Sequence, residues 1–363
     1  MKIPPCKPAF DKEMEEAAIN ALRNEKFVLG ESVTKFEEDF AKYCNVDYAL
    51  SVSSGTNAIT IALLAAGIKN NDEIITSASS YIATSNAVIH ATGKPIFCDI
   101  NDSYTIEVSQ IKDKIKDKTK GIIPVHLYGH PADIDEINTI AREHNLYTIE
   151  DAAQAHGALY KGKKIGSLTD IGCFSFYTTK NMTVCGDGGM ITTSNDKIAE
   201  KIDMIRNHGQ KEKDVHEIIG YTSRLNTVNA AIGRVQLKKL PKWVEQRRNI
   251  AKRYNELLSD VEEIILPPGD IDDKKPAYHL YEIKTKRRDE LVKYLKENGI
   301  ICLIHYPTPI PLQPYYQNLY SYKKGDFPKS EELSNQAMDL PMFPDLKEDE
   351  IKYISEKIHD FFE

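Results

Sequence analysis

Two apolar runs, each followed by a chemically active residue, most constrain what this chain can fold into. Residues 146–149 lead into Glu150 and Asp151, and residues 171–177 end three residues before Lys180. Short apolar runs of this kind, separated by helical patterns, are typical of buried strands in a parallel sheet. Ligands bind such sheets at the carboxyl ends of the strands, where a carboxylate and an amine can face one molecule. The two runs therefore predict an α/β fold with a site formed by Asp151 and Lys180.

The surroundings of this pair favour a binding site over a simple ion pair. Taken alone, an Asp and a Lys at strand ends usually form a solvated ion pair, and that alternative stays open for these two residues. However, Ser175 lies within the second apolar run, where a hydroxyl needs a partner, and Gln154 follows Asp151 by three residues. The glycine-rich residues 186–189 then allow the backbone after Lys180 to come close to a ligand.

A second strand–turn–helix pattern suits an anion. Residues 48–52 are expected to form a strand, residues 53–57 (Ser-Ser-Gly-Thr-Asn) a turn, and residues 58–66 a helix. Free N–H groups at a helix start attract anions, and Gly55 lets a phosphate approach the backbone. An ordinary Ser or Thr N-cap explains the same residues equally well. No G-x-x-x-x-G-K or G-x-G-x-x-G pattern occurs, so binding of a nucleoside triphosphate or dinucleotide has no local support.

The remaining sequence predicts a large α/β domain followed by a smaller one. Further strands are expected at residues 73–76, 95–100, 121–126 and 189–193, with helices between them. Residues 209–220 are expected to form a charged loop, and residues 227–258 a helix interrupted at Pro241. The second unit is expected to contain strands near residues 279–284 and 300–304 and helices near residues 287–298, 329–339 and 347–361. The expected domains are residues 1–245, with an irregular arm at residues 1–10, and residues 246–363.

Composition excludes several classes of function. The chain has 47 basic and 54 acidic residues, a formal charge of −7 and no basic face, so nucleic acid is not an expected partner. The six cysteines are scattered without a C-x-x-C pair, which predicts neither a disulfide framework nor a metal site. No apolar run approaches the roughly 20 residues of a membrane span, and the start lacks the apolar core of a signal peptide. We therefore expect no membrane association and a cytoplasmic location.

Six separated motifs along nearly the whole chain resemble one known family. They are Ser54-Gly55-Thr56, Tyr81-Ile82-Ala83-Thr84, Val125-His126-Leu127-Tyr128-Gly129, residues 150–157, residues 174–180 and Arg206-Asn207-His208-Gly209. In this order they resemble the DegT/DnrJ/EryC1/StrS family of pyridoxal-phosphate sugar aminotransferases. The resemblance implies the type I PLP-dependent transferase (aspartate aminotransferase) fold. That fold has a large domain with a mostly parallel sheet flanked by helices, plus a smaller C-terminal α+β domain.

The resemblance assigns the catalytic roles to Lys180 and Asp151. Lys180 would form a Schiff base with pyridoxal 5'-phosphate (PLP), which cycles through pyridoxamine phosphate, and would then move the proton as general base. Asp151 would keep the ring nitrogen protonated. Members of the family that dehydrate a sugar carry His in place of this Lys, so Lys180 favours an aminotransferase.

Five further residues are implied to hold the cofactor. Tyr81 would stack on the ring, and Gln154 would form a hydrogen bond near its phenolic oxygen. Gly55, Thr56 and Ser175 would bind the phosphate. Without the resemblance, a core tyrosine and an ordinary helix cap explain Tyr81 and Thr56 about as well.

The resemblance places other residues on the substrate side. Asn181 and His305 would line the way to a nucleotide-linked keto sugar, and Arg224 would bind the carboxylate of the amino donor, which the resemblance makes glutamate. Packing for His305 and a structural salt bridge for Arg224 are the alternatives. Residues 220–224 would come from the partner subunit of a homodimer, with Thr222 near the phosphate. Family members usually have Asn at this position, so the shorter Thr222 puts that contact in doubt.

The expected activity is therefore transfer of an amino group from an amino acid to a keto group of a nucleotide-linked deoxysugar, for surface-polysaccharide or glycoconjugate synthesis. One alternative is amination of a compound without a nucleotide, such as a keto-cyclitol, on the same fold. Another is a regulatory or sensor protein that keeps the fold without catalysis, although the intact set of cofactor residues argues against it. A chance match in an unrelated α/β protein is the third.

Overall fold

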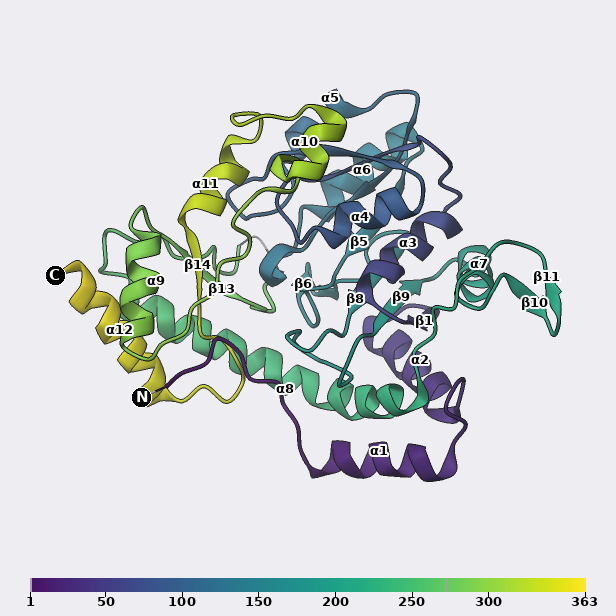
Figure 1. The fold of residues 1–363 in the computed structure, drawn as a ribbon, viewed down its shortest axis with the longest axis horizontal. Helices are drawn as coiled ribbons and strands as arrows, with labels where there is room; N and C mark the ends of the chain where they lie inside the picture. The colour runs from purple at the N-terminus through teal and green to yellow at the C-terminus, as the bar shows by residue number, and fades with distance from the viewer. Residues whose placement is uncertain (1, 272) are drawn as a thin grey trace.

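A seven-stranded sheet forms the centre of the computed structural model, which describes residues 2–271 and 273–363 (Figure 1). Within this sheet β9 is antiparallel to both of its neighbours and the other six strands run in one direction. The carboxyl ends of those six strands therefore meet at one edge, where ligands bind such sheets. In spatial order the strands are β1 (Tyr48–Val52), β9 (Gly189–Thr193), β8 (Ile171–Ser175), β5 (Tyr147–Asp151), β4 (Thr119–Ile123), β2 (Glu73–Ser77) and β3 (Lys94–Cys98).

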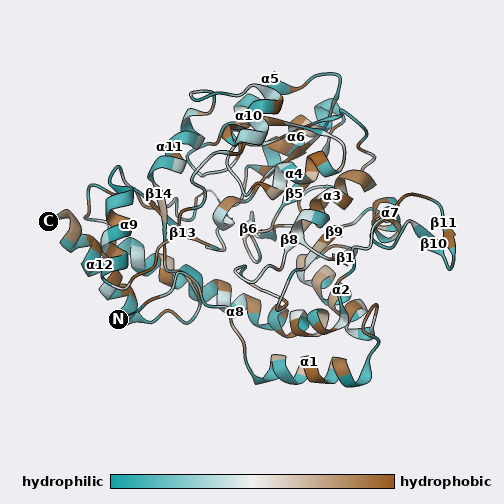
Figure 2. Ribbon diagram, viewed as in Figure 1, coloured by the Kyte–Doolittle hydropathy of each residue, from teal (hydrophilic) through white to brown (hydrophobic). Residues whose placement is uncertain are grey.

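Helices cover both faces of this sheet. One face is covered by α2 (Glu31–Cys44), α6 (Ile134–His144) and the first half of α8 (Thr227–Leu258), and the other by α3 (Gly55–Ala65), α4 (Ala83–His90) and α7 (Asp196–Arg206). Neighbouring residues of a strand enter opposite cores, as Ile74 and Ile75 do, because successive side chains alternate. In Figure 2, α3 is mostly coloured hydrophobic after its first turn, whereas the outer helix α1 (Lys12–Asn24) has polar and apolar bands.

A smaller core lies at the other end of α8. It contains Ile250 and Tyr254 of α8 together with β13 (Tyr281–Lys284), β14 (Ala337–Leu340), α9 (Arg288–Glu297) and α12 (Glu348–Phe362). Ile3 is fully buried in this core, so the N-terminal arm packs against the C-terminal unit. Along α8, Val244 still belongs to the large core, and the change to the small core occurs by Ile250. The domain boundary at 245/246 stays a prediction.

Pro241 does not interrupt α8, contrary to the sequence prediction. The helix runs through it from Thr227 to Leu258. A proline in a helix interior costs about 3 kcal/mol, whereas burial of a large apolar side chain contributes roughly 1.5–3 kcal/mol. Leu240 and Val244, on either side of the proline, are both buried. Their burial offsets the lost hydrogen bond and keeps the helix continuous.

Two other predictions differ from the structure. Residues 209–220 contain a hairpin, β10 (Gln210–Glu212) and β11 (Val215–His216), where a loop was expected, because short charged strands lack the apolar alternation that reveals a strand. Residues 300–304 form isolated bridges at Ile300 and Leu303 in place of the expected strand. The end of the expected helix at residues 329–339 belongs to β14.

The remaining elements are short and lie around the sheet. They are η1 (Val108–Gln110), α5 (Ile111–Lys114), η2 (Leu127–Gly129), β6 (Leu159–Tyr160), β7 (Lys163–Lys164), β12 (Lys274–Lys275), η3 (Ile310–Leu312), α10 (Pro314–Tyr320) and α11 (Pro328–Gln336). Both α10 and α11 pack back onto the large domain, where Tyr316 donates to Asn86 (2.8 Å) and Ser330 donates to Asp99 (2.6 Å). In the two described ranges, no helix combines the length and apolar character required to cross a bilayer.

Candidate active site

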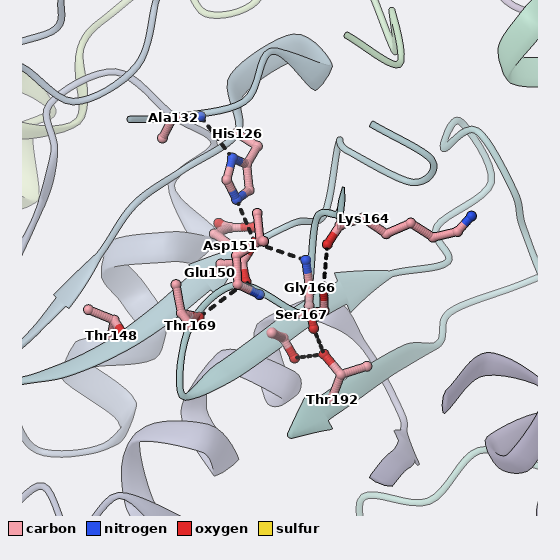
Figure 3. A network of polar contacts seen from close by, with 12 residues as sticks. His126, Ala132, Thr148, Glu150, Asp151, Lys164, Gly166, Ser167, Thr169 and Thr192 are labelled. Atoms are coloured by element: carbon pink, nitrogen blue, oxygen red, sulfur yellow. Dashed lines mark hydrogen bonds and ion pairs between the residues drawn. The ribbon is translucent and has the colours of Figure 1, made fainter. Parts of the chain in front are cut away.

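Glu150 and Asp151 are neighbours at the end of β5, and their side chains point to opposite faces of the sheet because side chains alternate along a strand. Glu150 is fully buried and accepts a hydrogen bond from the N–H of Gly166 (2.8 Å). His126 donates to Glu150 from Nε2 (3.0 Å), since its Nδ1 accepts from the N–H of Ala132 (Figure 3). This network anchors the end of β5 and leaves Asp151 to the opposite face.

Asp151 is buried at the carboxyl end of β5, and both of its carboxylate oxygens are held. The hydroxyl of Thr84, in the first turn of α4, donates to Oδ2 (2.7 Å), and the N–H of Ala153 donates to Oδ1 (3.1 Å). These two bonds fix the direction of the carboxylate at the strand edge. In the sequence, Thr84 is notable only as the last residue of a family motif, so its contact with Asp151 was not predicted.

Lys180 follows β8 after a short turn, in which its N–H donates to the carbonyl of Tyr177 (2.9 Å). The side chain is partly buried. Loss of solvation lowers the pKa of its amine from 10.5 to about 8, and the carboxylate of Asp151 opposes part of this shift. Asp151 and Lys180 therefore lie within electrostatic range of each other. An amine with this pKa offers a useful neutral fraction near neutral pH.

The turn after β1 and the end of β8 form a cradle of hydrogen-bond donors. A Cβ on Gly55 would lie 2.6 Å from the Cβ of Ser175, so only glycine allows the two segments to approach this closely. Ser54 caps α3 by accepting from the N–H of Asn57 (3.1 Å). Within the described residues, the N–H groups of Gly55 and Thr56 and the hydroxyl of Thr56 have no partner. Ser175 accepts from a backbone N–H (3.3 Å) and keeps its own proton to donate.

Gln154 contacts aromatic residues from two distant segments, and a third aromatic residue packs against one of them. This buried amide accepts from the N–H of Tyr128 (2.6 Å) and donates to the hydroxyl of Tyr306 (3.0 Å). Tyr306 also lies against Tyr81, with 5.6 Å between ring centroids. Tyr81 is 56% exposed, so its ring is available for stacking. The contacts of Tyr128 and Tyr306 were missed because they join residues that lie 26 and 152 positions from Gln154.

The segment around Thr222 only partly adjoins this cluster. Ser223 reaches the cradle of the same chain, where its hydroxyl lies 2.9 Å from that of Ser53. Thr222 is exposed, and its hydroxyl contacts a ring nitrogen of His208 (3.1 Å). Arg224 donates to a neutral amide oxygen 2.7 Å away, and no carboxylate pairs with it in the described part of the chain. The predicted contact of Thr222 with a partner subunit's cofactor stays a prediction.

Asn181 and His305 occupy different surroundings. Asn181 is buried and donates to the carbonyl of Ala277 (3.0 Å), and its side-chain oxygen has no hydrogen-bond partner among the described residues. His305 immediately precedes Tyr306, is partly exposed and pairs through Nδ1 with Asp339. Of these two predicted substrate residues, only His305 adjoins the aromatic wall of the site.

These residues suit PLP. The unused N–H groups and hydroxyls of the cradle match a phosphate, and the fixed carboxylate of Asp151 matches a protonated ring nitrogen. The exposed ring of Tyr81 matches a flat heterocycle, and the amine of Lys180 matches its aldehyde. Among the described residues, no group of three or more His, Cys, Asp or Glu side chains is arranged to hold a metal ion.

Comparison with known proteins decides the family. The model of the DegT/DnrJ/EryC1/StrS aminotransferase family matches residues 8–359. The chain belongs to this family. The enzymes of the family are PLP-dependent aminotransferases, so the predicted family, fold class and enzyme class are confirmed. The roles assigned to individual site residues stay predictions.

Individual relatives are similar over nearly their full length. A Streptomyces venezuelae protein named dTDP-3-amino-3,4,6-trideoxy-alpha-D-glucose transaminase is 36% identical over 97% of this chain and 92% of its own. A Geobacillus stearothermophilus protein named pleiotropic regulatory protein is 42% identical over 98% of this chain and 95% of its own. The crystal structure of S. venezuelae DesV in complex with a ketimine intermediate superposes with a TM-score of 0.96 at 35% identity, covering 100% of this chain and 99% of that one.

Proposed function

We propose that this DegT/DnrJ/EryC1/StrS aminotransferase uses PLP to move an amino group from glutamate to the keto group of a nucleotide-linked deoxysugar, for glycoconjugate or surface-polysaccharide synthesis. The family supports the aminotransferase reaction. The name of the S. venezuelae relative, which includes a dTDP-linked amino sugar, supports the class of acceptor. Glutamate follows from the resemblance of the sequence to the family.

The observation that carries the proposal is the partly buried amine of Lys180, whose pKa is lowered and which lies near Asp151 beside a cradle of unused donors. When bound there, PLP supplies an electron sink for the carbanion of the amino acid. Lys180 acts as the base that moves the proton from the α-carbon of the donor. Asp151, oriented by Thr84, holds the proton on the ring nitrogen, and the cradle that includes Gly55 fixes the phosphate.

Three residues complete the proposal on the substrate side. Arg224, which has no carboxylate partner within the described residues, is suited to bind the carboxylate of the donor. His305 contacts the nucleotide-linked acceptor, and Asn181 supports the loop after Lys180. We also propose a homodimer in which Thr222 approaches the site of the other subunit.

Reconstitution with PLP followed by two separate half-reactions tests this function. We expect visible absorbance from the bound cofactor, loss of that absorbance on addition of glutamate, and its return on addition of a nucleotide-linked keto sugar. The Lys180→Ala variant should lack the absorbance and the turnover, whereas Lys161→Ala, which removes an exposed lysine paired with Asp135, should retain both.

The same experiment separates the alternatives. Acceptors should include dTDP-, UDP- and GDP-linked keto sugars and a free keto-cyclitol. Reaction with the cyclitol alone would replace the nucleotide-sugar proposal. A protein that stays colourless with PLP would favour the regulatory alternative, which the name of the G. stearothermophilus relative makes worth testing.

A further inference from the structure

Two buried acids face each other in the small unit. Glu282 of β13 and Asp339 of β14 are directly opposite in the antiparallel pair and are 0% and 3% exposed. Within the described residues, both oxygens of Glu282 and Oδ1 of Asp339 have no hydrogen-bond partner. Side chains directly opposite on two strands are roughly 5 Å apart. At that distance in a buried environment, two carboxylates cannot both be charged.

The position of the proton follows from the surroundings of each acid. Burial, and then the proximity of Asp339, raise the pKa of Glu282 well above its ordinary value. Burial also raises the pKa of Asp339, but contact with His305 opposes that shift. Glu282 therefore carries the proton, and Asp339 carries the negative charge that faces His305.

The acid pair lies on the side of the β13–β14 ribbon that faces away from the small core. Tyr281 and Ile283 of β13 and Met338 of β14 belong to that core. Because side chains alternate along a strand, Glu282 and Asp339 point to the opposite side. Figure 1 shows β13 and β14 between α9 and the central sheet, so this opposite side is turned toward the large domain.

His305 connects the pair to the candidate active site. Its Nδ1 pairs with Oδ2 of Asp339, and its carbonyl accepts from the hydroxyl of Tyr128. The next residue, Tyr306, contacts Tyr81 on the wall of the site. The side chain of His305 is 27% exposed, and its Nε2 has no hydrogen-bond partner in the part of the chain that the structure describes. Nδ1 of His305 is thus held by Asp339, and Nε2 is open to a ligand.

We propose that Asp339 is a positioning residue that fixes His305 on the acceptor side of the site, so that Nε2–H of His305 donates to the diphosphate of the nucleotide-linked sugar. With the carboxylate of Asp339 at Nδ1 and a phosphate oxygen at Nε2, each ring nitrogen of His305 has an acceptor, so in the complex both nitrogens act as donors. Hydrogen bonds to the charged oxygens of a phosphate are stronger than hydrogen bonds between neutral groups. Because the chain carries a formal charge of −7, an anionic ligand depends on local donors such as this ring nitrogen. The inference rests on the proposed function, since the diphosphate belongs to that acceptor.

A double-mutant cycle on the PLP-loaded protein tests the proposal. The variants are Asp339→Asn, His305→Gln and the double variant, and the measurement is calorimetric titration with dTDP and, separately, UDP. We expect each single variant to weaken binding of the better nucleotide by roughly tenfold and the double variant to weaken it no further, because both changes remove one interaction. In turnover, KM for the keto sugar should rise while the rate of the half-reaction with glutamate stays unchanged.

A matched control separates positioning from general loss of stability. Asp99→Asn also removes a buried carboxylate, but one that accepts from the N–H groups of Lys329 and Ser330 in α11. It should lower the melting temperature without changing nucleotide affinity. If Asp339→Asn does not fold, Asp339→Ser takes its place in the cycle, since it removes the charge and relieves the crowded pair.

Each remaining outcome overturns a specific statement. Additive effects in the cycle, or unchanged nucleotide affinity in Asp339→Asn, would show that Asp339 does not act through His305. An equal loss in both half-reactions would show a general structural role. If the unmodified protein binds neither nucleotide and aminates no nucleotide-linked sugar, the proposed function itself fails.

Discussion

Gly55 at the start of α3 and Ser175 at the end of β8 are in such close contact that a Cβ on Gly55 would lie 2.6 Å from the Cβ of Ser175. The two residues are 120 positions apart in the sequence, and their contact joins the turn after β1 to the strand that leads into Lys180. The proposed phosphate cradle therefore depends on the absence of a side chain at Gly55.

The Gly55→Ala variant should separate these two segments and weaken the binding of PLP. The backbone of Ser175 has to move because its Cα would also lie 3.2 Å from the new methyl group. Displaced phosphate donors should cost roughly tenfold or more in cofactor affinity, the effect of losing about one charge-assisted hydrogen bond. The measurement is titration of the apoprotein with PLP. As the control, Gly269→Ala adds a methyl group with no atom within 4 Å and should leave the affinity unchanged.

Removal of the hydroxyl that orients Asp151 should slow catalysis without removing the cofactor. In Thr84→Val, Oδ2 of Asp151 loses its 2.7 Å bond, and the carboxylate is free to rotate away from the ring nitrogen. We expect kcat to fall roughly tenfold, the usual range for one lost hydrogen bond to a charged group, with PLP affinity nearly unchanged. Thr139→Val, which removes an exposed hydroxyl bonded to a helix carbonyl, is the matched control. An unchanged kcat in Thr84→Val would show that Asp151 does not depend on this bond.

Much of the candidate site was predictable because its residues lie next to strand ends. Asp151, Ser175 and Lys180 follow apolar runs that are recognisable in the sequence, and the parallel sheet brings those ends to one edge. The contacts of Thr84 and Tyr306 were not predictable, because they depend on how distant segments pack.

In the small C-terminal unit, the contacts of a buried acid were even harder to predict from the sequence. A single acid within a short apolar run, such as Asp339, looks like a solvent-facing residue of an edge strand. Its burial opposite Glu282 depends on a pairing across 57 residues, from 282 to 339. Pro241 shows the converse. A proline inside a helix usually interrupts it, but packing of α8 against both cores keeps this helix continuous.

The pKa of Lys180 predicts how reconstitution depends on pH. Only the neutral amine reacts with an aldehyde, and burial lowers the pKa of this amine to about 8. The rate of PLP incorporation into the apoprotein should therefore rise with pH, reach half of its maximum near this pKa and level off above it, well below the ordinary value of 10.5. The measurement is the growth of cofactor absorbance in a series of buffers. Because the carboxylate of Asp151 raises this pKa, Asp151→Asn should move the transition to lower pH, and a shift to higher pH would contradict the arrangement.

The buried acid Glu282 predicts a stability that falls as pH rises. Its pKa in the folded protein is raised well above 4.5, by burial first and by Asp339 second, so the folded state binds a proton that the unfolded state has released. Between pH 4.5 and the raised pKa of the folded protein, the free energy of unfolding falls by about 1.4 kcal/mol per pH unit. Among the described residues, the titratable groups that interact electrostatically with Glu282 are Asp339 and the phenols of Tyr104, Tyr128, Tyr278 and Tyr281, none of which supplies a positive charge.

Glu282→Gln should remove this pH dependence, because Gln keeps the shape of the neutral acid and has no proton to lose. The variant should match the unmodified protein below about pH 4.5, the ordinary value for Glu, and exceed its stability by a margin that grows with pH up to the raised pKa of Glu282, as linkage requires. Urea unfolding at several pH values measures the difference. Glu348→Gln, which changes an exposed acid paired with Arg253, should give a small difference with little dependence on pH, because exposed pairs contribute little. A margin for Glu282→Gln that does not grow with pH would mean that Glu282 is charged in the folded protein.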